Sequence, residues 1–70
     1  MSSDKKYLYN ETREKINQAI ISNEKKMALI YLLEEKYKTI EDYFDFRQES
    51  QNVLIRLLTY ELEDDRSSMN

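Results

Sequence analysis

The stretch MALIYLL, residues 27–33, holds seven apolar side chains in a row between charged flanks. In a helix of about 3.6 residues per turn, such a run covers about two turns without leaving a polar face. A helix that is apolar all round is normally buried all round. We therefore expect this stretch to lie in a helix that has neighbours on more than one side.

The rest of the chain also favours helices. Its 70 residues include no Gly and no Pro, the two residues that most strongly mark hairpins and tight turns. Good helix formers, among them Leu, Glu, Lys and Gln, are common throughout. The sequence predicts an all-α chain: one helical domain over residues 1–70, with frayed ends at about 1–4 and 66–70.

Apolar residues recur at spacings of three and four, which is the pattern of one buried helical stripe. The first part of this stripe consists of Leu8, Thr12, Ile16, Ala19, Ile20, Asn23, Met27 and Ile30. Leu33, Tyr37, Ile40 and Phe44 continue it, and Leu54, Leu57, Leu58 and Leu62 follow after a polar stretch at 47–52. The period alone would allow one very long helix.

Local chemistry favours a break at Lys38-Thr39. Thr39 is followed three residues later by Asp42, which resembles a capping box at the start of a helix. Lys36 and Lys38 suit the negative end of a preceding helix. The sequence thus predicts an antiparallel helical hairpin, with two long helices at about 5–36 and 40–65.

Two further breaks stay open at this stage. Residues 22–24, Ser-Asn-Glu, combine two capping residues with an acid, and residues 49–52 form the most polar gap in the apolar pattern. Either would add a third, shorter helix. A single long coiled-coil helix is the remaining alternative.

Charge is distributed unevenly along the chain. Residues 1–38 carry eight basic and six acidic side chains, whereas residues 39–70 carry three basic and eight acidic ones. In an antiparallel hairpin turning near residue 38, Lys15 would lie near Glu61, Arg13 near Glu63 and Lys26 near Glu49. Exposed pairs of this kind select the orientation of the helices more than they stabilise the fold.

A hairpin of this size cannot cover all of its apolar surface. Seventy residues bury only about 60% of the unfolded surface, so we expect assembly into a dimeric four-helix bundle or coiled coil. In MALIYLL, Met27, Ile30, Tyr31 and Leu33 are expected to face the partner helix of the same chain, and Ala28, Leu29 and Leu32 to face another chain. A homodimer and a heteromeric subunit both fit. The expected assembly interface consists of Leu29, Ile30, Leu32, Leu33, Leu54, Ile55, Leu57 and Leu58.

Two further groups are candidates for binding a partner protein. Tyr37, Tyr43 and Phe46 lie near the predicted turn, and aromatic residues are enriched at protein interfaces; the alternative is that they only cap the bundle. The acidic group consists of Glu61, Glu63, Asp64 and Asp65.

Composition leaves little room for enzyme chemistry. There is no Cys and no His, so thiolate nucleophiles, imidazole bases and the common zinc ligand sets are missing. We therefore expect no catalytic activity, no cofactor and no metal site. The longest apolar run is far shorter than the roughly 20 residues of a membrane span, which predicts a soluble, intracellular protein in the cytoplasm or nucleus.

The sequence favours a small protein-binding module that acts as an adaptor, an assembly subunit or a stoichiometric regulator. The alternative is a nucleic-acid-associated protein that uses the Lys and Arg side chains of the first helix. A calculated pI of about 4.9 weighs against that alternative, because phosphate neutralisation dominates nucleic-acid affinity.

Overall fold

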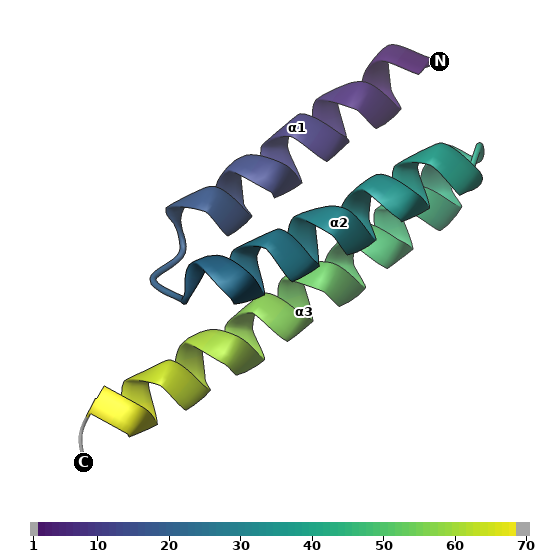
Figure 1. The fold of residues 1–70 in the computed structure, drawn as a ribbon. Coiled ribbons are helices and arrows are strands. Elements are labelled where there is room, and N and C mark those ends of the chain that lie inside the picture. The colour runs from purple at the N-terminus through teal and green to yellow at the C-terminus, as the bar shows by residue number, and fades with distance from the viewer. Residues whose placement is uncertain (1, 69–70) are drawn as a thin grey trace.

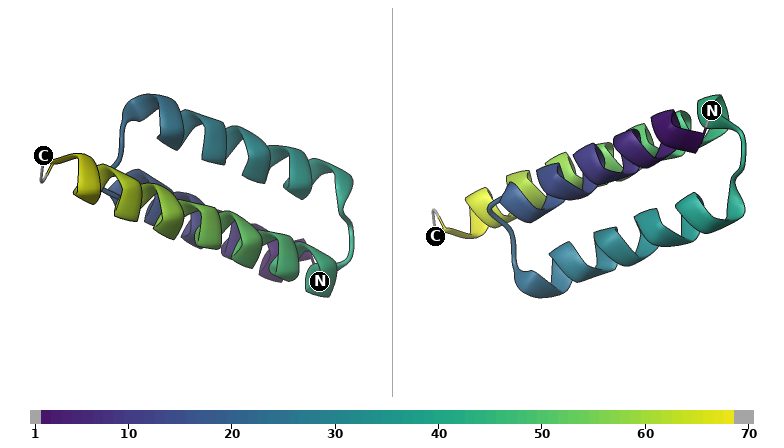
Figure 2. Two further views of the ribbon diagram at one scale, coloured as in Figure 1. Left: turned by 90° about the horizontal axis from the view of Figure 1, so that it is seen from below. Right: turned by 90° about the horizontal axis from the view of Figure 1, so that it is seen from above.

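The structure of this chain is a computed structural model, which describes residues 2–68 and the side chains of residues 4–63. Over this part the chain forms three helices, α1 (Ser2–Gln18), α2 (Asn23–Thr39) and α3 (Tyr43–Ser68). They run up, down and up side by side in a bundle about 47 Å long (Figure 1; Figure 2). The all-α prediction is confirmed, whereas the two-helix hairpin is wrong and the three-helix alternative is right.

The two ends of the chain were predicted to be frayed. The backbone is helical from Ser2 and up to Ser68, so the predicted frayed segments are helical where they are described. Residues 1, 69 and 70 lie outside the described residues. α3, with 26 residues, is longer than α1 and α2, with 17 each. Its C-terminal end extends beyond the turn between α1 and α2 (Figure 1).

The first break lies at residues 19–22 and has a local cause. Ser22 has an extended backbone, with φ −64° and ψ 154°, and its Oγ accepts a hydrogen bond from the backbone N–H of Lys25 at 3.3 Å. This satisfies one of the free N–H groups at the start of a helix. Glu24 in the first turn adds a favourable charge at the positive end of α2. The predicted helix at 5–36 is therefore interrupted by a cap inside it.

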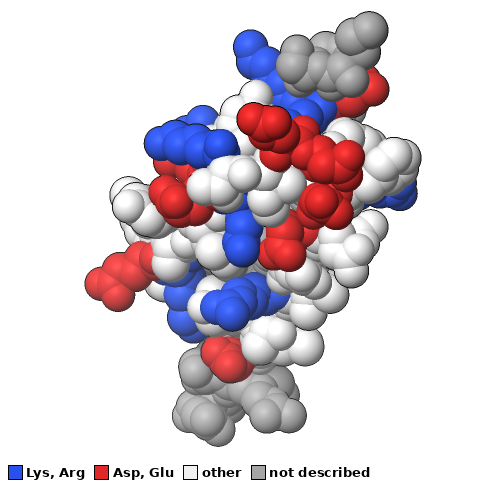
Figure 3. Space-filling view, turned by 90° about the vertical axis from the view of Figure 1, so that its right-hand side faces the viewer, with Lys and Arg blue, Asp and Glu red and all other residues white. Residues whose placement is uncertain are grey.

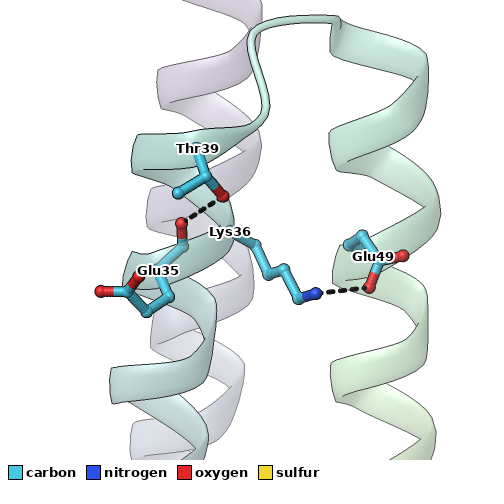
Figure 4. A network of polar contacts seen from close by, with 4 residues as sticks. All are labelled: Glu35, Lys36, Thr39 and Glu49. Atoms are coloured by element: carbon cyan, nitrogen blue, oxygen red, sulfur yellow. Dashed lines mark hydrogen bonds and ion pairs between the residues drawn. The ribbon is translucent and has the colours of Figure 1, made fainter.

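The second break lies at residues 40–42, at the predicted place but with a different cap. Asp42 Oδ2 accepts a hydrogen bond from the backbone N–H of Asp45 at 3.0 Å, so Asp42 caps α3. Thr39 was predicted to be that cap, which is wrong. It is the last residue of α2, and its Oγ1 donates to the carbonyl oxygen of Glu35 at 2.8 Å (Figure 4).

The register between the helices also differs from the prediction. Lys36 Nζ lies 3.5 Å from Glu49 Oε1 (Figure 4), and Lys25 Nζ lies 5.3 Å from the centre of the Tyr60 ring. The predicted proximity of Lys26 and Glu49 is therefore wrong.

The first helix departs from the predicted register as well. α1 runs parallel to α3 instead of antiparallel (Figure 2), so the predicted pairing of Lys15 with Glu61 and of Arg13 with Glu63 is wrong. Lys15 Nζ lies 3.9 Å from Glu11 Oε1 in its own helix. The extra turn at residues 19–22 is the reason, because it makes α1 antiparallel to α2 and therefore parallel to α3.

The core lies along the axis where the three helices meet. Its buried apolar residues are Ile16, Ala19, Leu29, Leu33, Phe46, Val53 and Leu57, and the buried polar residues are Thr12 and Ser50. The predicted stripe is confirmed through α1 as far as Ala19. It fails at Ile20, which is 87% exposed in the turn. The polar gap at 49–52 is no break: α3 continues through it, with Ser50 buried among its neighbours.

The stretch MALIYLL forms the centre of α2. Leu29 and Leu33 are buried, Ile30 and Leu32 are half-buried, and Met27, Ala28 and Tyr31 are exposed. The predicted outward direction of Leu29 and inward direction of Met27 and Tyr31 are therefore wrong. The reason is that α2 packs against both α1 and α3, so its buried arc is centred differently from that of a helix with one neighbour.

Candidate protein-binding surfaces

α3 carries apolar side chains on two opposite faces. One face points into the core through Phe46 and Val53. Phe44 and Ile55 are each two residues away from these, which corresponds to about 200° around the helix axis. The large apolar side chains of this second face are 60–72% exposed. We call this face the outer stripe; it consists of Phe44, Gln48, Gln51, Ile55, Leu58 and Leu62.

The outer stripe follows a heptad period. Gln48, Ile55 and Leu62 are spaced by seven and occupy the a positions of the heptad. Phe44, Gln51 and Leu58 are also spaced by seven and occupy the d positions. Alternating spacings of three and four along one face are typical of a helix that packs along its length against another helix. The described residues hold no such neighbour for α3 on this side, because α1 and α2 pack on its opposite face.

Charged and polar residues border the outer stripe on both sides. Arg47 and Glu61, at g positions, lie on the side toward α1, with half-buried Leu54 between them. Asp45 and Asn52, at e positions, lie on the side toward α2. The g border is thus basic near the start of α3 and acidic near its end, which gives the stripe a polarity.

A second apolar surface is a groove between α1 and α2 with a volume of about 530 Å³. Its apolar part is made by Met27, Ile30 and Tyr31 from the MALIYLL stretch. Arg13 and Lys26 add positive charge beside it. The complete lining consists of Arg13, Asn17, Asn23, Lys26, Met27, Ile30, Tyr31 and Glu34.

The basic side of the groove is held in place by a contact between helices. Lys26 Nζ donates a hydrogen bond of 2.9 Å to the carbonyl oxygen of Asn17, in the last turn of α1. A cation is favourable there because carbonyl groups are unpaired at the end of a helix. The groove is formed by α1 and α2, and the outer stripe points away from the core that all three helices share, so the two surfaces lie on opposite sides of the bundle.

Aromatic residues join the three helices at the end where α1 begins. The Tyr37 ring lies 4.7 Å from the Tyr9 ring and 5.6 Å from the Phe46 ring, measured between centroids. Lys5 Nζ lies 4.6 Å from the centre of the Tyr37 ring and donates to the carbonyl oxygen of Tyr37 at 2.6 Å. Aromatic pairs and cation–π contacts of this geometry stabilise by about 0.5–1.5 kcal/mol each. We call this group the aromatic junction.

Tyr9 in the aromatic junction has a perturbed hydroxyl. Its OH donates to Glu34 Oε1 at 3.3 Å. Burial, followed by the nearby negative charge of Glu34, raises the pKa of Tyr9 above its usual value of 10.0. The neutral phenol is thus favoured in the folded chain, which fits a structural hydrogen-bond donor.

The predicted assembly residues fall into three groups. Leu29, Leu33 and Leu57 are buried in the core of the single chain; Ile30, Leu32 and Leu54 are half-buried; Ile55 and Leu58 are exposed. Ile55 and Leu58 lie on the outer stripe, and Ile30 lines the groove. The structure thus brings together only part of the predicted set on any one surface.

The predicted partner-binding residues are also divided. Phe46 is 0% exposed and Tyr37 is half-buried, and both belong to the aromatic junction. Half-buried Tyr43 lies against the Phe44 ring at 5.6 Å. Glu61 is half-buried and Glu63 is exposed. The side chains of Asp64 and Asp65 lie outside the described residues.

Sequence reasoning missed the groove and the full outer stripe. Met27 and Tyr31 were assigned to the core, as were Phe44 and Leu62 in the apolar pattern. The signal for the stripe was present, because Phe44, Gln51 and Leu58 repeat at seven while Phe46, Val53 and Tyr60 repeat at seven on the other face. Two interleaved heptad patterns in one helix indicate two buried faces.

The rest of the described surface has fewer features that could bind a partner. A polar hollow of about 400 Å³ is lined by Ile40, Asp45, Gln48, Glu49 and Asn52. In the described part of the chain, no three acidic, His or Cys side chains come together in a way that would hold a metal ion. Nor is any described helix long and apolar enough to cross a membrane. Figure 3 shows basic side chains lying among acidic ones on one face of the molecule.

No protein family, curated protein or solved structure matches this chain. Function is therefore inferred from the geometry of the chain itself.

Proposed function

We propose that this chain is a protein-binding module that works as an adaptor, an assembly subunit or a stoichiometric regulator. The observation that carries the proposal is the outer stripe of α3, where Phe44, Ile55, Leu58 and Leu62 remain exposed opposite the core. Apolar surface of this kind marks a site where another protein binds. Removing it from water contributes about 25 cal/mol for each Å² buried.

The two apolar surfaces face opposite sides of the bundle, which suits a protein that joins two others. The groove between α1 and α2 combines the apolar side chains of Met27 and Tyr31 with the cations Arg13 and Lys26. A partner that complements it is a helical segment with acidic residues beside a row of apolar ones, a common mode of recognition. The outer stripe lacks a cation along most of its length and is a separate surface.

The charge pattern supports protein binding over nucleic-acid binding. A nucleic-acid site needs a continuous row of Lys and Arg to neutralise phosphates. Lys15 is engaged with Glu11 and Lys36 with Glu49, and acidic side chains lie among the basic ones in Figure 3. The formal net charge of −3 acts in the same direction.

The test is a comparison of partners captured from the cell of origin by the full chain and by variants. Met27→Glu combined with Tyr31→Glu places negative charge in the groove and is expected to abolish capture of the groove's partner. Ala28→Glu, an exposed change on α2 at a position that lines neither surface, is the control and should retain that partner.

Two results would overturn the proposal. One is an identical set of captured proteins for the full chain, the double variant and an outer-stripe variant. The other is recovery of nucleic acid, with an affinity that falls steeply as salt is raised. Circular dichroism of each variant establishes that the helices are intact before capture is compared.

A further inference from the structure

We infer that the outer stripe of α3 is a self-association seam, which pairs antiparallel with α3 of a second copy of this chain. The inference rests on the proposed function, in which the chain acts by binding proteins, and it names one partner. It leaves the groove between α1 and α2 free on the far side of each copy. Because each copy has three helices, the dimer has six helices and not the four of the predicted bundle.

The heptad positions give the pairing its geometry. In an antiparallel pair, residues at a positions of one helix face residues at d positions of the other. Phe44 then faces Leu62 of the second copy, Gln48 faces Leu58, and Gln51 faces Ile55. The same layers repeat in reverse on the other side of the two-fold axis. Every layer thus holds at least one large apolar side chain.

Charge complementarity selects the second copy as occupant. In this register Arg47 at a g position lies beside Glu61 of the second copy, and the two-fold axis repeats the pair. The two Leu54 side chains lie beside each other near the axis, on the same border. One surface therefore provides both halves of each ion pair, which is the property of an isologous interface.

The acidic end of α3 selects the antiparallel direction. Glu61 and Glu63 lie near the C-terminal end of the stripe. A parallel pair would bring these acidic residues of both copies to the same end. An antiparallel pair places them at opposite ends, with Glu61 beside Arg47 of the other copy. Like charges held close together destabilise an interface, whereas opposite charges fix its register.

The seam predicts a reversible association. Its layers span residues 44–62, a length of about 27 Å at 1.5 Å per residue. This is short for a coiled coil, and two of the six positions on each helix are Gln, which favours register over affinity. However, α3 is already held as a helix by α1 and α2, so pairing does not pay for its folding. We expect a dimer that dissociates on dilution.

The first test measures mass against concentration by sedimentation equilibrium. The unmodified chain is expected to change from a mass near 8.6 kDa to twice that mass as its concentration rises. Leu58→Lys puts a charge in the seam and should move the midpoint at least about tenfold to higher concentration. Tyr31→Lys, the matched change at an exposed position on the groove side, should leave the midpoint where it is.

The second test addresses direction. Arg47→Glu and Glu61→Arg should each weaken association, and the two changes together should restore it, because they exchange the partners of one pair. In a parallel pair the two residues lie 14 positions apart along the seam, and the double variant would not recover. The chain has no Cys, so a single Asn52→Cys should be joined to its copy by a short bis-maleimide, whereas Gln48→Cys should not. Cross-linking of Gln48→Cys alone would overturn the antiparallel arrangement.

The outcomes separate this inference from the proposed function. A chain that stays monomeric up to high concentration, yet still loses its partner through Met27→Glu with Tyr31→Glu, overturns the seam and supports protein binding. A dimer that Leu58→Lys does not weaken also overturns the seam. A Leu58→Lys variant that loses its helical dichroism is replaced by Leu62→Lys, which lies farther from the core and makes the same prediction.

Discussion

At the scale of single residues, Ser50 is an unusual member of the core. It is 1% exposed, and its Oγ has no hydrogen-bond partner among the described residues. A buried polar group without a partner costs about 1–3 kcal/mol. The sequence alone could not show that Ser50 is buried, because it stands in a run of polar residues that resembles a loop.

Ser50→Ala is therefore expected to stabilise the chain. Replacement removes the unpaired hydroxyl and adds about 0.5 kcal/mol of helix propensity, so the free energy of unfolding should rise by about 1–2 kcal/mol. Urea unfolding followed by circular dichroism measures the change. Ser50→Val is the opposite control: its extra volume should destabilise a close-packed site. An unchanged or lowered stability for Ser50→Ala would mean that the hydroxyl has a partner.

Tyr9 gives a dependence on pH whose direction follows from its raised pKa. A group whose pKa is higher in the folded than in the unfolded chain contributes stability that is present below the unfolded value. That stability is lost as the pH rises from the usual value of 10.0 through the folded value. The free energy of unfolding should thus fall as the pH is raised above 10.0. Tyr9→Phe should make this fall shallower.

Unfolding in urea at a series of alkaline pH values measures the effect of Tyr9→Phe. Tyr7→Phe, the same change at an exposed ring, is the control. Its free energy of unfolding should vary with pH in the same way as that of the unmodified chain. The comparison of the two Phe variants removes contributions that both variants share. Identical slopes for both variants would show that Glu34 and burial do not act on Tyr9.

At the scale of elements, the capping residues in the sequence indicate where helices can break, but they do not show which of the possible breaks occur. Ser22-Asn23-Glu24 and Thr39-Ile40-Glu41-Asp42 both carry capping residues, and both sites are real breaks. The cap of α3 was assigned to Thr39 because its hydroxyl precedes an acid by three residues. The carboxylate of Asp42 is used instead, since it lies directly before α3, and Thr39 is left to bond back to Glu35. Sequence patterns fix such a choice only to within a few residues.

The two caps should contribute comparably to stability. Ser22→Ala and Asp42→Ala each remove the side-chain acceptor at the start of a helix, which costs about 0.5–2 kcal/mol. Thermal unfolding followed by circular dichroism measures both. Thr39→Ala, which removes a hydroxyl bonded only to the preceding turn, is the control and should cost less than either. A larger loss for Thr39→Ala would return the role of cap to Thr39.

At the scale of the whole molecule, the helical class was predictable and the faces were not. The period of three and four identifies helices, and it identified Ile16, Ala19 and Leu33 as core residues. Which side of α2 points inward depends on how many helices surround it. The turn at residues 19–22 makes α1 a second neighbour of α2 and reverses the direction of α1. The inward face of α2 is therefore centred closer to Leu29. The candidate site depends on the same turn, because the outer stripe is exposed only when α1 and α2 both pack on the opposite side of α3.

The prediction at this scale compares two residues of MALIYLL. Leu29 is buried between the helices and Met27 is 70% exposed. Leu29→Ala should lower the free energy of unfolding by about 2–5 kcal/mol, because it leaves a cavity in the core. This is a large part of the stability of a chain so small, so the variant is expected to be partly unfolded at ambient temperature. Met27→Ala should change the free energy of unfolding by less than about 0.5 kcal/mol.

The comparison is made by urea unfolding, at a concentration low enough to keep the chain monomeric. Dilution matters because self-association through α3 would add to the apparent stability of both variants. Leu29→Ala is then repeated at high concentration: if α3 pairs as inferred, mass action should recover part of the lost helix, and Leu29→Ala combined with Leu58→Lys should not recover it. Equal losses for Leu29→Ala and Met27→Ala would instead mean that α2 has rotated about its axis, and that its inward face is the one a two-helix hairpin would have.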